Sequence, residues 1–252
     1  MPSLWELQIT GIDASHVRAT GIHRFLSAWF GETTDEHNTI KGYSVRERVD
    51  ERDGVTLRLG CVSDSLAELV AEIPAGLPVQ FGTTYPHNGL VAQPPRCVTE
   101  ESWDDLKTYQ GTTQWRLRFL TPVSLRSDGV DQPWPHPYSV LNGLAAKWER
   151  FGPPAQPSYQ EEFGRGVGVT GAELRTVLSD RAPRPVFGAE GSVEWTWLGA
   201  RRCANPDGVP AIERLLRLAR FAGMGSYAQF GSGAVGVVGR RADPKRPRAR
   251  RS

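Results

Sequence analysis

The sequence has few cysteines and lysines and lacks a long hydrophobic run. Its 252 residues include only three cysteines, which are widely spaced and form no Cys-x-x-Cys pair. This spacing supports neither a disulfide framework nor a cysteine-based zinc site. No segment approaches the ~18 consecutive apolar residues that a membrane-spanning helix needs. The first residues lack the basic and apolar regions of a signal peptide. We therefore expect a cytoplasmic protein with no membrane partner.

Charge is distributed unevenly along the chain. The 30 basic and 28 acidic residues give a formal net charge of +2, which by itself argues against a nucleic-acid binder. Residues 240–252 contain seven of the basic residues and one of the acidic ones, so the rest of the chain has a net charge of −4. We predict that 240–252 is a disordered basic tail. It is either a nonspecific tether for phosphates or a solubilising end.

Hydrophobic patterns predict the same order of elements in both halves of the chain, namely strand, helix, strand, strand, helix, strand. The elements expected in the first half are strand 4–10, a helix capped by Asp13 and ending at Gly31, strands 43–49 and 55–61, a helix opened by Asp64, and strands 77–82 and 90–98. Those expected in the second half are strand 114–121, helix 138–151, strands 167–178 and 193–198, a helix from Pro210 to Gly223, and strand 234–238. The prediction is an α+β fold of two tandem ferredoxin-like (βαββαβ) domains, residues 1–110 and 111–239.

The most informative segment is 218–238, LARFAGMGSYAQFGSGAVGVV, which follows a predicted helix and precedes a predicted strand. Glycine lets a backbone approach a ligand closely and present N–H groups to an anion. The segment is not a P-loop, because no Gly-Lys-Ser/Thr follows, and a dinucleotide loop would open a helix rather than follow one. A mobile hairpin is the simpler alternative. Two Gly-x-Gly pairs favour an anion-binding loop, and their residues are Gly223, Gly225, Gly231 and Gly233.

Arginines on two predicted elements are candidates for binding a phosphodiester backbone. Three lie at three-residue intervals on the helix before the glycine segment, so we expect them on adjoining parts of one face. Two more lie on strand 114–121, on the side opposite its apolar residues. These candidates are Arg214, Arg217, Arg220, Arg116 and Arg118.

The glycine segment resembles the C-terminal signature of the RAMP superfamily, and in particular the CRISPR-associated endoribonucleases that process precursor CRISPR RNA. Three further segments resemble that family: FLTPVSLRSDG at 119–129, HVRATGIHRFLSAWF at 16–30, and EHNTIKGYSV at 36–45, which looks like its histidine segment. The resemblance implies metal-independent cleavage within the repeat, with no cofactor. The ribose 2′-OH attacks the adjacent phosphate and leaves a 5′-OH and a 2′,3′-cyclic phosphate. The implied partners are CRISPR repeat RNA and other CRISPR effector subunits.

The resemblance also implies which residues carry the chemistry. It places His37 where the family has its catalytic histidine, and histidine suits proton transfer near neutral pH. Lys41, four residues later, would stabilise the charge on the phosphorane. His23 on the first helix competes for the catalytic role or supports the substrate. Tyr43 offers a nearby hydroxyl, although packing in the sheet is the favoured interpretation. Without the resemblance, His37 and Lys41 read as an ordinary exposed loop histidine and a solvated lysine.

Two other functions stay open from the sequence. A non-catalytic RNA-binding subunit of a CRISPR effector complex would share the fold and the glycine segment but would need no placed histidine. An unrelated ferredoxin-like enzyme could instead hold a nucleotide in the glycine segment and act on small molecules.

Overall fold

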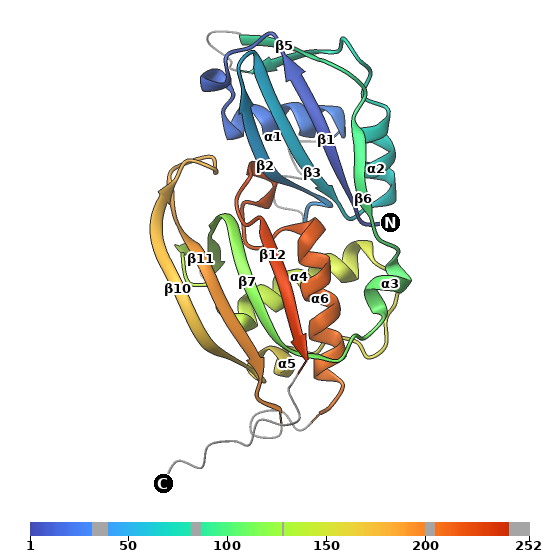
Figure 1. Ribbon diagram of the computed structural model, residues 1–252, viewed down its shortest axis with the longest axis vertical. Coiled ribbons are helices and arrows are strands. Elements are labelled where there is room, and N and C mark those ends of the chain that lie inside the picture. The colour runs from blue at the N-terminus through green and yellow to red at the C-terminus, as the bar shows by residue number, and fades with distance from the viewer. Residues whose placement is uncertain (32–39, 82–86, 128, 200–204, 242–252) are drawn as a thin grey trace.

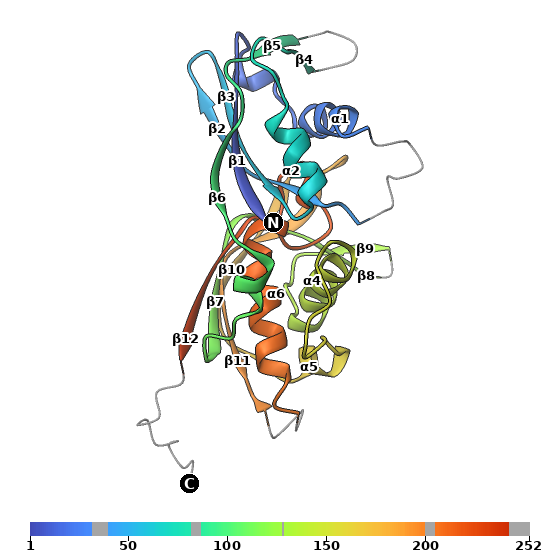
Figure 2. The same ribbon diagram turned by 90° about the vertical axis from the view of Figure 1, so that its right-hand side faces the viewer.

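A computed structural model describes residues 1–31, 40–81, 87–127, 129–199 and 205–241. Two β-sheets follow one another along the long axis of the molecule, the N-terminal sheet above the C-terminal one (Figure 1). The larger helices lie on the same side of both sheets, so the opposite faces of the sheets are open (Figure 2). This arrangement gives the molecule a helix side and an open sheet side.

The N-terminal sheet has six strands in the described residues, in the order β2-β3-β1-β5-β4, with β6 also paired to β1. Strands β2, β3, β1 and β6 with helices α1 and α2 form the βαββαβ unit, and β4 and β5 add a hairpin. The elements are β1 (Ser3–Thr10), α1 (Ala19–Trp29), β2 (Tyr43–Glu51), β3 (Gly54–Cys61), α2 (Asp64–Ala71), β4 (Pro78–Phe81), β5 (His87–Val91), β6 (Arg96–Glu100) and the linking helix α3 (Trp103–Lys107).

The C-terminal sheet is antiparallel, with the order β10-β11-β7-β12. It repeats the βαββαβ order, with a small hairpin, β8–β9, and a short helix, α5, as additions. The elements are β7 (Thr112–Val123), β8 (Leu125–Ser127), β9 (Val130–Gln132), α4 (Pro137–Phe151), α5 (Glu161–Arg165), β10 (Val167–Ser179), β11 (Val186–Trp197), α6 (Gly208–Ala222) and β12 (Val235–Arg241).

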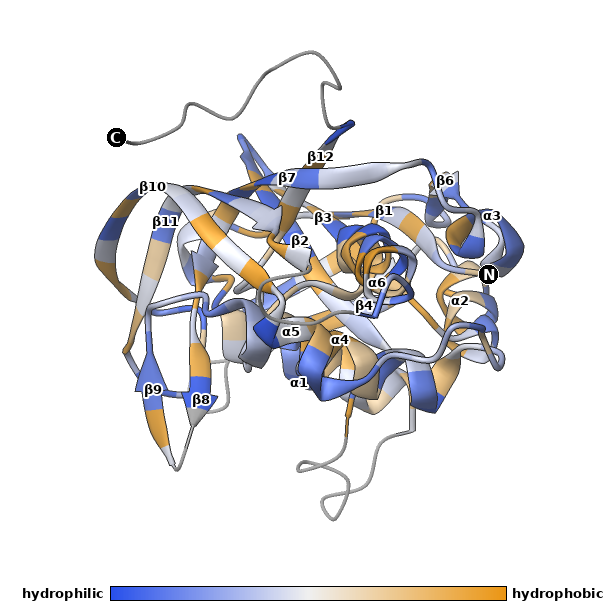
Figure 3. Ribbon diagram, turned by 90° about the horizontal axis from the view of Figure 1, so that it is seen from below, coloured by the Kyte–Doolittle hydropathy of each residue, from blue (hydrophilic) through white to orange (hydrophobic). Residues whose placement is uncertain are grey.

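Alternation along β7 sets the two faces of the C-terminal sheet. Trp115, Leu117 and Phe119 are buried in the core that α4 and α6 cover, and Figure 3 shows α6 between β12 and α4. The intervening Arg116 and Arg118 are exposed, as the alternation predicts. Helix α6 has an apolar stripe along most of its length, which explains why it lies deep between the sheet and α4.

Several predicted boundaries differ from the structure for local reasons. Asp13 caps the short 3-10 turn Ala14–His16, where its carboxylate accepts the Ser15 N–H at 2.8 Å, and α1 begins only after Arg18. The predicted strand 90–98 is divided into β5 and β6. Its interruption contains two consecutive prolines, which lack the N–H that a ladder needs. Strand β12 continues through Arg241, beyond the predicted start of the tail.

Candidate functional site

A buried polar cluster joins helix α1 to strand β2. The Nδ1 atom of His23 lies 2.9 Å from the Tyr43 hydroxyl and 3.3 Å from the Ser27 hydroxyl. The two hydroxyls are themselves 3.2 Å apart. Ser27 follows His23 by one helical turn, so both side chains project from the same face of α1. The cluster holds the imidazole in one orientation, and a Tyr43 hydroxyl that donates to Nδ1 leaves the ring proton on Nε2.

The glycine segment supplies the other wall of this cluster. The ring centroid of Phe230 lies 4.1 Å from that of His23. Phe230 ends the 3-10 turn Ala228–Phe230, which lies between the two Gly-x-Gly pairs. His23 is 9% exposed and Tyr43 is 1% exposed. The candidate site is therefore assembled from both halves of the chain.

The structure describes two of the three predicted catalytic residues. His23 contacts Tyr43 as described, and Lys41 is buried and precedes the first residue of β2 by two positions. His37 lies outside the described residues. Packing in the sheet was the favoured interpretation of Tyr43, and Ser27 was not among the predicted site residues. The i,i+4 spacing of Ser27 from His23 was the signal that could have found it.

The glycine segment is packed into the protein rather than spread as an open loop. All four glycines have positive φ, between +65° and +102°. A Cβ on Gly233 would lie 1.7 Å from the Met224 carbonyl oxygen, and one on Gly225 would lie 2.3 Å from that of Ser124. The N–H groups of three of them donate to backbone carbonyls at 3.0, 3.3 and 2.8 Å, namely those of Gly223, Gly231 and Gly233. The expectation that these three N–H groups face an anion is wrong, because close chain packing uses them.

Side chains of β2 reach across to the last turn of α6. The Ser44 hydroxyl donates to the carbonyl oxygen of Phe221 at 2.7 Å, and the buried Arg46 donates to that of Ala219 at 3.1 Å. The Phe221 carbonyl lies in the last turn of the helix, where carbonyl groups lack partners within the helix, so the Ser44 hydroxyl satisfies it. The Ala219 carbonyl accepts the Gly223 N–H at 3.0 Å as well as the bond from Arg46. Burial, with a smaller contribution from the nearby positive charge of Arg220, lowers the pKa of Arg46 to about 10. The contacts fix the glycine segment against the N-terminal domain.

The predicted arginine ridge on α6 is only partly present. Arg214 is 3% exposed, donates to the Pro157 carbonyl oxygen at 2.7 Å and stacks on Trp148 at 5.0 Å. Its placement on an exposed face is wrong, since each three-residue step turns the helix by about 60° and carries Arg214 away from Arg220. Of the three arginines on α6, only Arg220 is exposed.

Arg217 is tied to the segment that connects the two sheets. Its guanidinium donates to the carbonyl oxygens of Asp105 and Thr108 at 2.7 and 3.0 Å, and it also pairs with Glu101. The Arg217 side chain is 20% exposed. These bonds give Arg217 a structural role that its position in the helix did not reveal.

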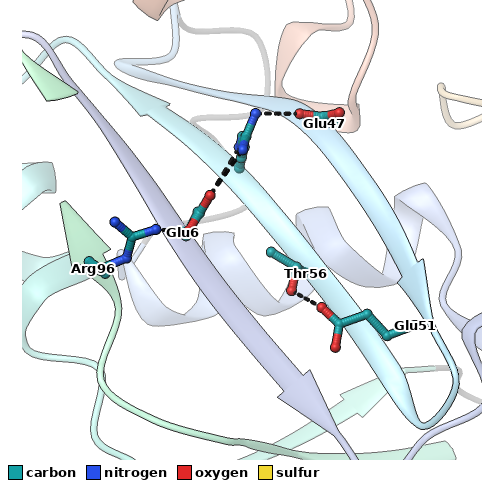
Figure 4. A network of polar contacts seen from close by, with 6 residues as sticks. Glu6, Glu47, Glu51, Thr56 and Arg96 are labelled. Atoms are coloured by element: carbon teal, nitrogen blue, oxygen red, sulfur yellow. Dashed lines mark hydrogen bonds and ion pairs between the residues drawn. The ribbon is translucent and has the colours of Figure 1, made fainter. Parts of the chain in front are cut away.

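A groove of about 580 Å³ is lined by residues of both domains. Four arginines line it, but so do three glutamates. On its N-terminal side, Arg58 donates to Glu6 at 3.1 Å and to Glu47 at 2.9 Å, and Arg96 also pairs with Glu6 (Figure 4). Two of the four arginines in the lining, Arg58 and Arg217, are therefore paired with carboxylates within the protein.

His23 and two of the candidate RNA-binding arginines lie on different sides of the molecule. His23 belongs to α1, on the helix side, whereas Arg116 and Arg118 face outward from the open sheet (Figure 2). The structure therefore does not assemble all the predicted site residues into one surface. Among the residues that the structure describes, no group of three or more His, Cys, Asp or Glu side chains could hold a metal ion. No helix in the described part of the chain is long and apolar enough to cross a membrane.

Comparison with known proteins confirms the resemblance noted from the sequence. Residues 117–235 match the family model of the CRISPR-associated endoribonuclease Cas6. This part of the chain is similar to the Cas6 family. Two Cas6 endoribonucleases of Mycobacterium tuberculosis, from strains CDC 1551 and H37Rv, are 30% identical to it over 128 residues. That match covers 50% of this chain and 39% of each relative.

Solved Cas6 structures show the same fold. A Cas6 product complex is 19% identical, covers 94% of this chain and 99% of its own, and has a TM-score of 0.76. Thermus thermophilus Cas6 is 18% identical, covers 94% and 98% of the two chains, and has a TM-score of 0.66. A Cas6-related protein from Pyrococcus furiosus is 10% identical, covers 94% and 99%, and has a TM-score of 0.51. The predicted fold of two ferredoxin-like domains is confirmed.

Proposed function

We propose that this chain is an endoribonuclease that cuts precursor CRISPR RNA within its repeats to give mature guide RNA. The observation that carries the proposal is the His23–Tyr43 pair against the glycine segment, because it places a hydrogen-bonded imidazole at the junction of the two domains. The match of residues 117–235 to Cas6 supports the reaction class. Some matched Cas6 structures are complexes with a product or a substrate mimic, which supports RNA as the substrate.

The proposed chemistry needs no metal ion. The 2′ oxygen attacks the adjacent phosphorus, the bond from phosphorus to the 5′ oxygen breaks, and a proton moves from the 2′-OH to the leaving oxygen through protein groups. We assign proton transfer to His37, with His23 as the competing or supporting imidazole, and charge stabilisation to Lys41. One of the matched Cas6 structures was solved as a His-to-Ala variant, which agrees with a central role for a histidine.

Solvent exposure separates the candidate arginines that can contact RNA from those that cannot. Arg116, Arg118 and Arg220 are exposed and can contact a phosphate backbone, whereas Arg214 and Arg217 act on RNA only through the packing they maintain. The glycine segment shapes the site through its backbone. Other CRISPR effector subunits are further proposed partners.

The test uses a radiolabelled repeat RNA with the full chain in buffer that contains EDTA. Cutting at one position, with a 5′-OH and a 2′,3′-cyclic phosphate at the new ends, is the expected result. Tight, salt-sensitive binding without cutting would instead identify an RNA-binding subunit. No binding to the repeat would overturn the proposal and favour an enzyme acting on small molecules.

A further inference from the structure

A small cationic pocket lies on the helix side of the glycine segment, away from the interdomain groove. Its volume is about 170 Å³, and the glycine segment forms its floor. Helix α4 and strand β8 form its walls, and Figure 2 shows both on the same side of the molecule as α1. The lining includes two cationic side chains, two serines and two of the segment's glycines, namely Arg126, Lys147, Ser139, Ser226, Gly223 and Gly225.

The lining of this pocket differs from that of the interdomain groove and of the cavity beside the start of α1 because it contains no carboxylate. None of its lining residues, all within the described part of the chain, is an aspartate or a glutamate. The lining of the interdomain groove combines four arginines with three glutamates, and the lining of a third cavity, beside the start of α1, combines three arginines with one aspartate. Two cations without a carboxylate in the lining, together with hydroxyl donors, form the arrangement that binds a phosphate or another oxyanion.

Lys147 is held in place without being neutralised. Its ammonium donates to the carbonyl oxygen of Ala222 at 2.6 Å, which leaves two of its three N–H bonds for other acceptors. Among the described residues no carboxylate pairs with it. Burial, with a smaller contribution from the positive charge of Arg46, lowers the pKa of Lys147 to about 8. A bound anion would offset both effects.

Arg126 has a suitable position on the opposite wall. It is exposed on β8, and its cross-strand neighbour on β9 is Asp131. That carboxylate already accepts a bond from Arg184 at 3.1 Å and one from the Tyr227 hydroxyl at 2.9 Å. The charge of Asp131 is therefore shared with other partners.

We propose that this pocket binds one phosphate group of the RNA strand, held by Lys147 and Arg126 with help from the hydroxyls of Ser139 and Ser226. The volume lies below the roughly 300 Å³ at which pockets begin to hold drug-sized ligands, so it fits a phosphate rather than a nucleoside. The same glycine segment lines the pocket at Ser226 and touches His23 through Phe230 four residues later. A phosphate in the pocket thus anchors the strand close to the candidate catalytic imidazole.

The proposal that the phosphate belongs to RNA rests on the proposed function. The test therefore has two arms, one for phosphate alone and one for RNA. The first measures binding of inorganic phosphate to the full chain by titration calorimetry. The second measures binding and cleavage of repeat RNA as a function of salt. Both arms use Lys147→Met, Lys147→Arg and Arg126→Gln, with Arg150→Gln as the control because Arg150 is exposed on the same helix and does not line the pocket.

We expect Lys147→Met and Arg126→Gln each to weaken RNA binding about tenfold or more. Each should also lower the salt slope of binding by about 0.7, the value of one lost phosphate contact on a single strand. Arg150→Gln should bind as the wild type. Phosphate binding should weaken as the pH rises through about 8, the pKa of Lys147, and Lys147→Arg should remove this dependence. Because Arg126 is exposed, its variant keeps the test valid if Lys147→Met does not fold.

The proposal would be overturned if Arg126→Gln and a folded Lys147→Met variant both bound RNA with the affinity and the salt slope of the wild type. Phosphate binding that depends on Lys147, in a chain that neither binds nor cuts repeat RNA, would also overturn RNA as the source. In that case the proposed function fails and the pocket is a site for free phosphate.

Discussion

The hydroxyl of Ser44 on β2 donates a 2.7 Å hydrogen bond to the carbonyl oxygen of Phe221, near the end of α6 and 177 residues further along the chain. Gly60, opposite Ser44 in the β2–β3 ladder, makes this contact possible. A Cβ at Gly60 would lie 2.0 Å from the Phe221 oxygen and 2.8 Å from the Ser44 hydroxyl. The two domains therefore meet at a point where only glycine fits.

Replacing Gly60 with alanine should separate the domains at this point. We expect a loss of about 2–3 kcal/mol in the free energy of unfolding, since the clash is with backbone rather than with a movable side chain. Denaturation in urea measures it. Gly143→Ala is the control, because a Cβ there meets nothing within 4 Å and alanine should stabilise α4 by up to about 1 kcal/mol. Equal stability of the Gly60→Ala variant and the wild type would contradict the interdomain packing.

Tyr43→Phe should reduce cleavage while the fold is kept. The variant removes only the Tyr43 hydroxyl, so the imidazole of His23 loses the shorter of its bonds to the Tyr43 and Ser27 hydroxyls. We expect a fall of about tenfold or more in the single-turnover rate constant, with RNA affinity unchanged, and a stability loss of about 1 kcal/mol. Tyr138→Phe is the matched control, since the Tyr138 hydroxyl bonds to Glu161 at 2.8 Å on an exposed surface. An unchanged rate in Tyr43→Phe would remove the pair from the mechanism.

His37→Ala should abolish cleavage of repeat RNA and leave binding largely intact, because its imidazole is the assigned proton-transfer group. The same substitution at His23 distinguishes the competing roles. A partial loss in His23→Ala identifies a supporting residue, and a complete loss identifies an essential one. Gel-shift and cleavage assays on the same samples give both readouts. His136→Ala should behave as the wild type. Undiminished cleavage by the His37 variant would disprove its assignment.

Arg217→Met should destabilise the protein much more than Arg220→Met. The first variant leaves the carbonyl oxygens of Asp105 and Thr108 and the Glu101 carboxylate without their donor. We expect a cost of about 2–4 kcal/mol in the free energy of unfolding. Arg220 is exposed, so its loss should cost less than about 0.5 kcal/mol. Chemical denaturation of both variants provides the comparison, and equal costs would contradict the structural role of Arg217.

The lowered pKa of Lys147 predicts how stability changes with pH. Between pH 8 and pH 10.5 the unfolded lysine binds a proton that the folded one has released, so the free energy of unfolding rises with pH across this window. Below pH 8 both forms are charged and the contribution is constant. Lys147→Met should lack this rise. Urea denaturation of both proteins across this range, in buffer without phosphate, measures the difference. Parallel curves would show that Lys147 is not desolvated.

Local patterns were enough to predict most of the fold. On β7 and on α6, apolar residues recur with the period of a strand or a helix because one face of each element is buried. This period can be read from the sequence. The end of α6 at Gly223 also follows from the chain itself, since only glycine adopts its φ of +65° readily. The prediction of one strand over 90–98 was wrong, because Pro94 and Pro95 lack the N–H groups that a continuous ladder needs.

The functional surfaces depended on contacts between distant residues. Spacing along α6 could not show that Arg214 packs against Trp148 or that Arg217 holds the linking segment, because both partners come from other elements. Likewise, Lys147 becomes a weakly basic group only where the end of α6 and the glycine segment enclose it. The sequence by itself determined the two βαββαβ units and the sharp turns of the glycine segment, through side-chain period and backbone sterics. Only the tertiary structure decided which charges stay exposed, because desolvation and pairing depend on what the rest of the chain brings alongside.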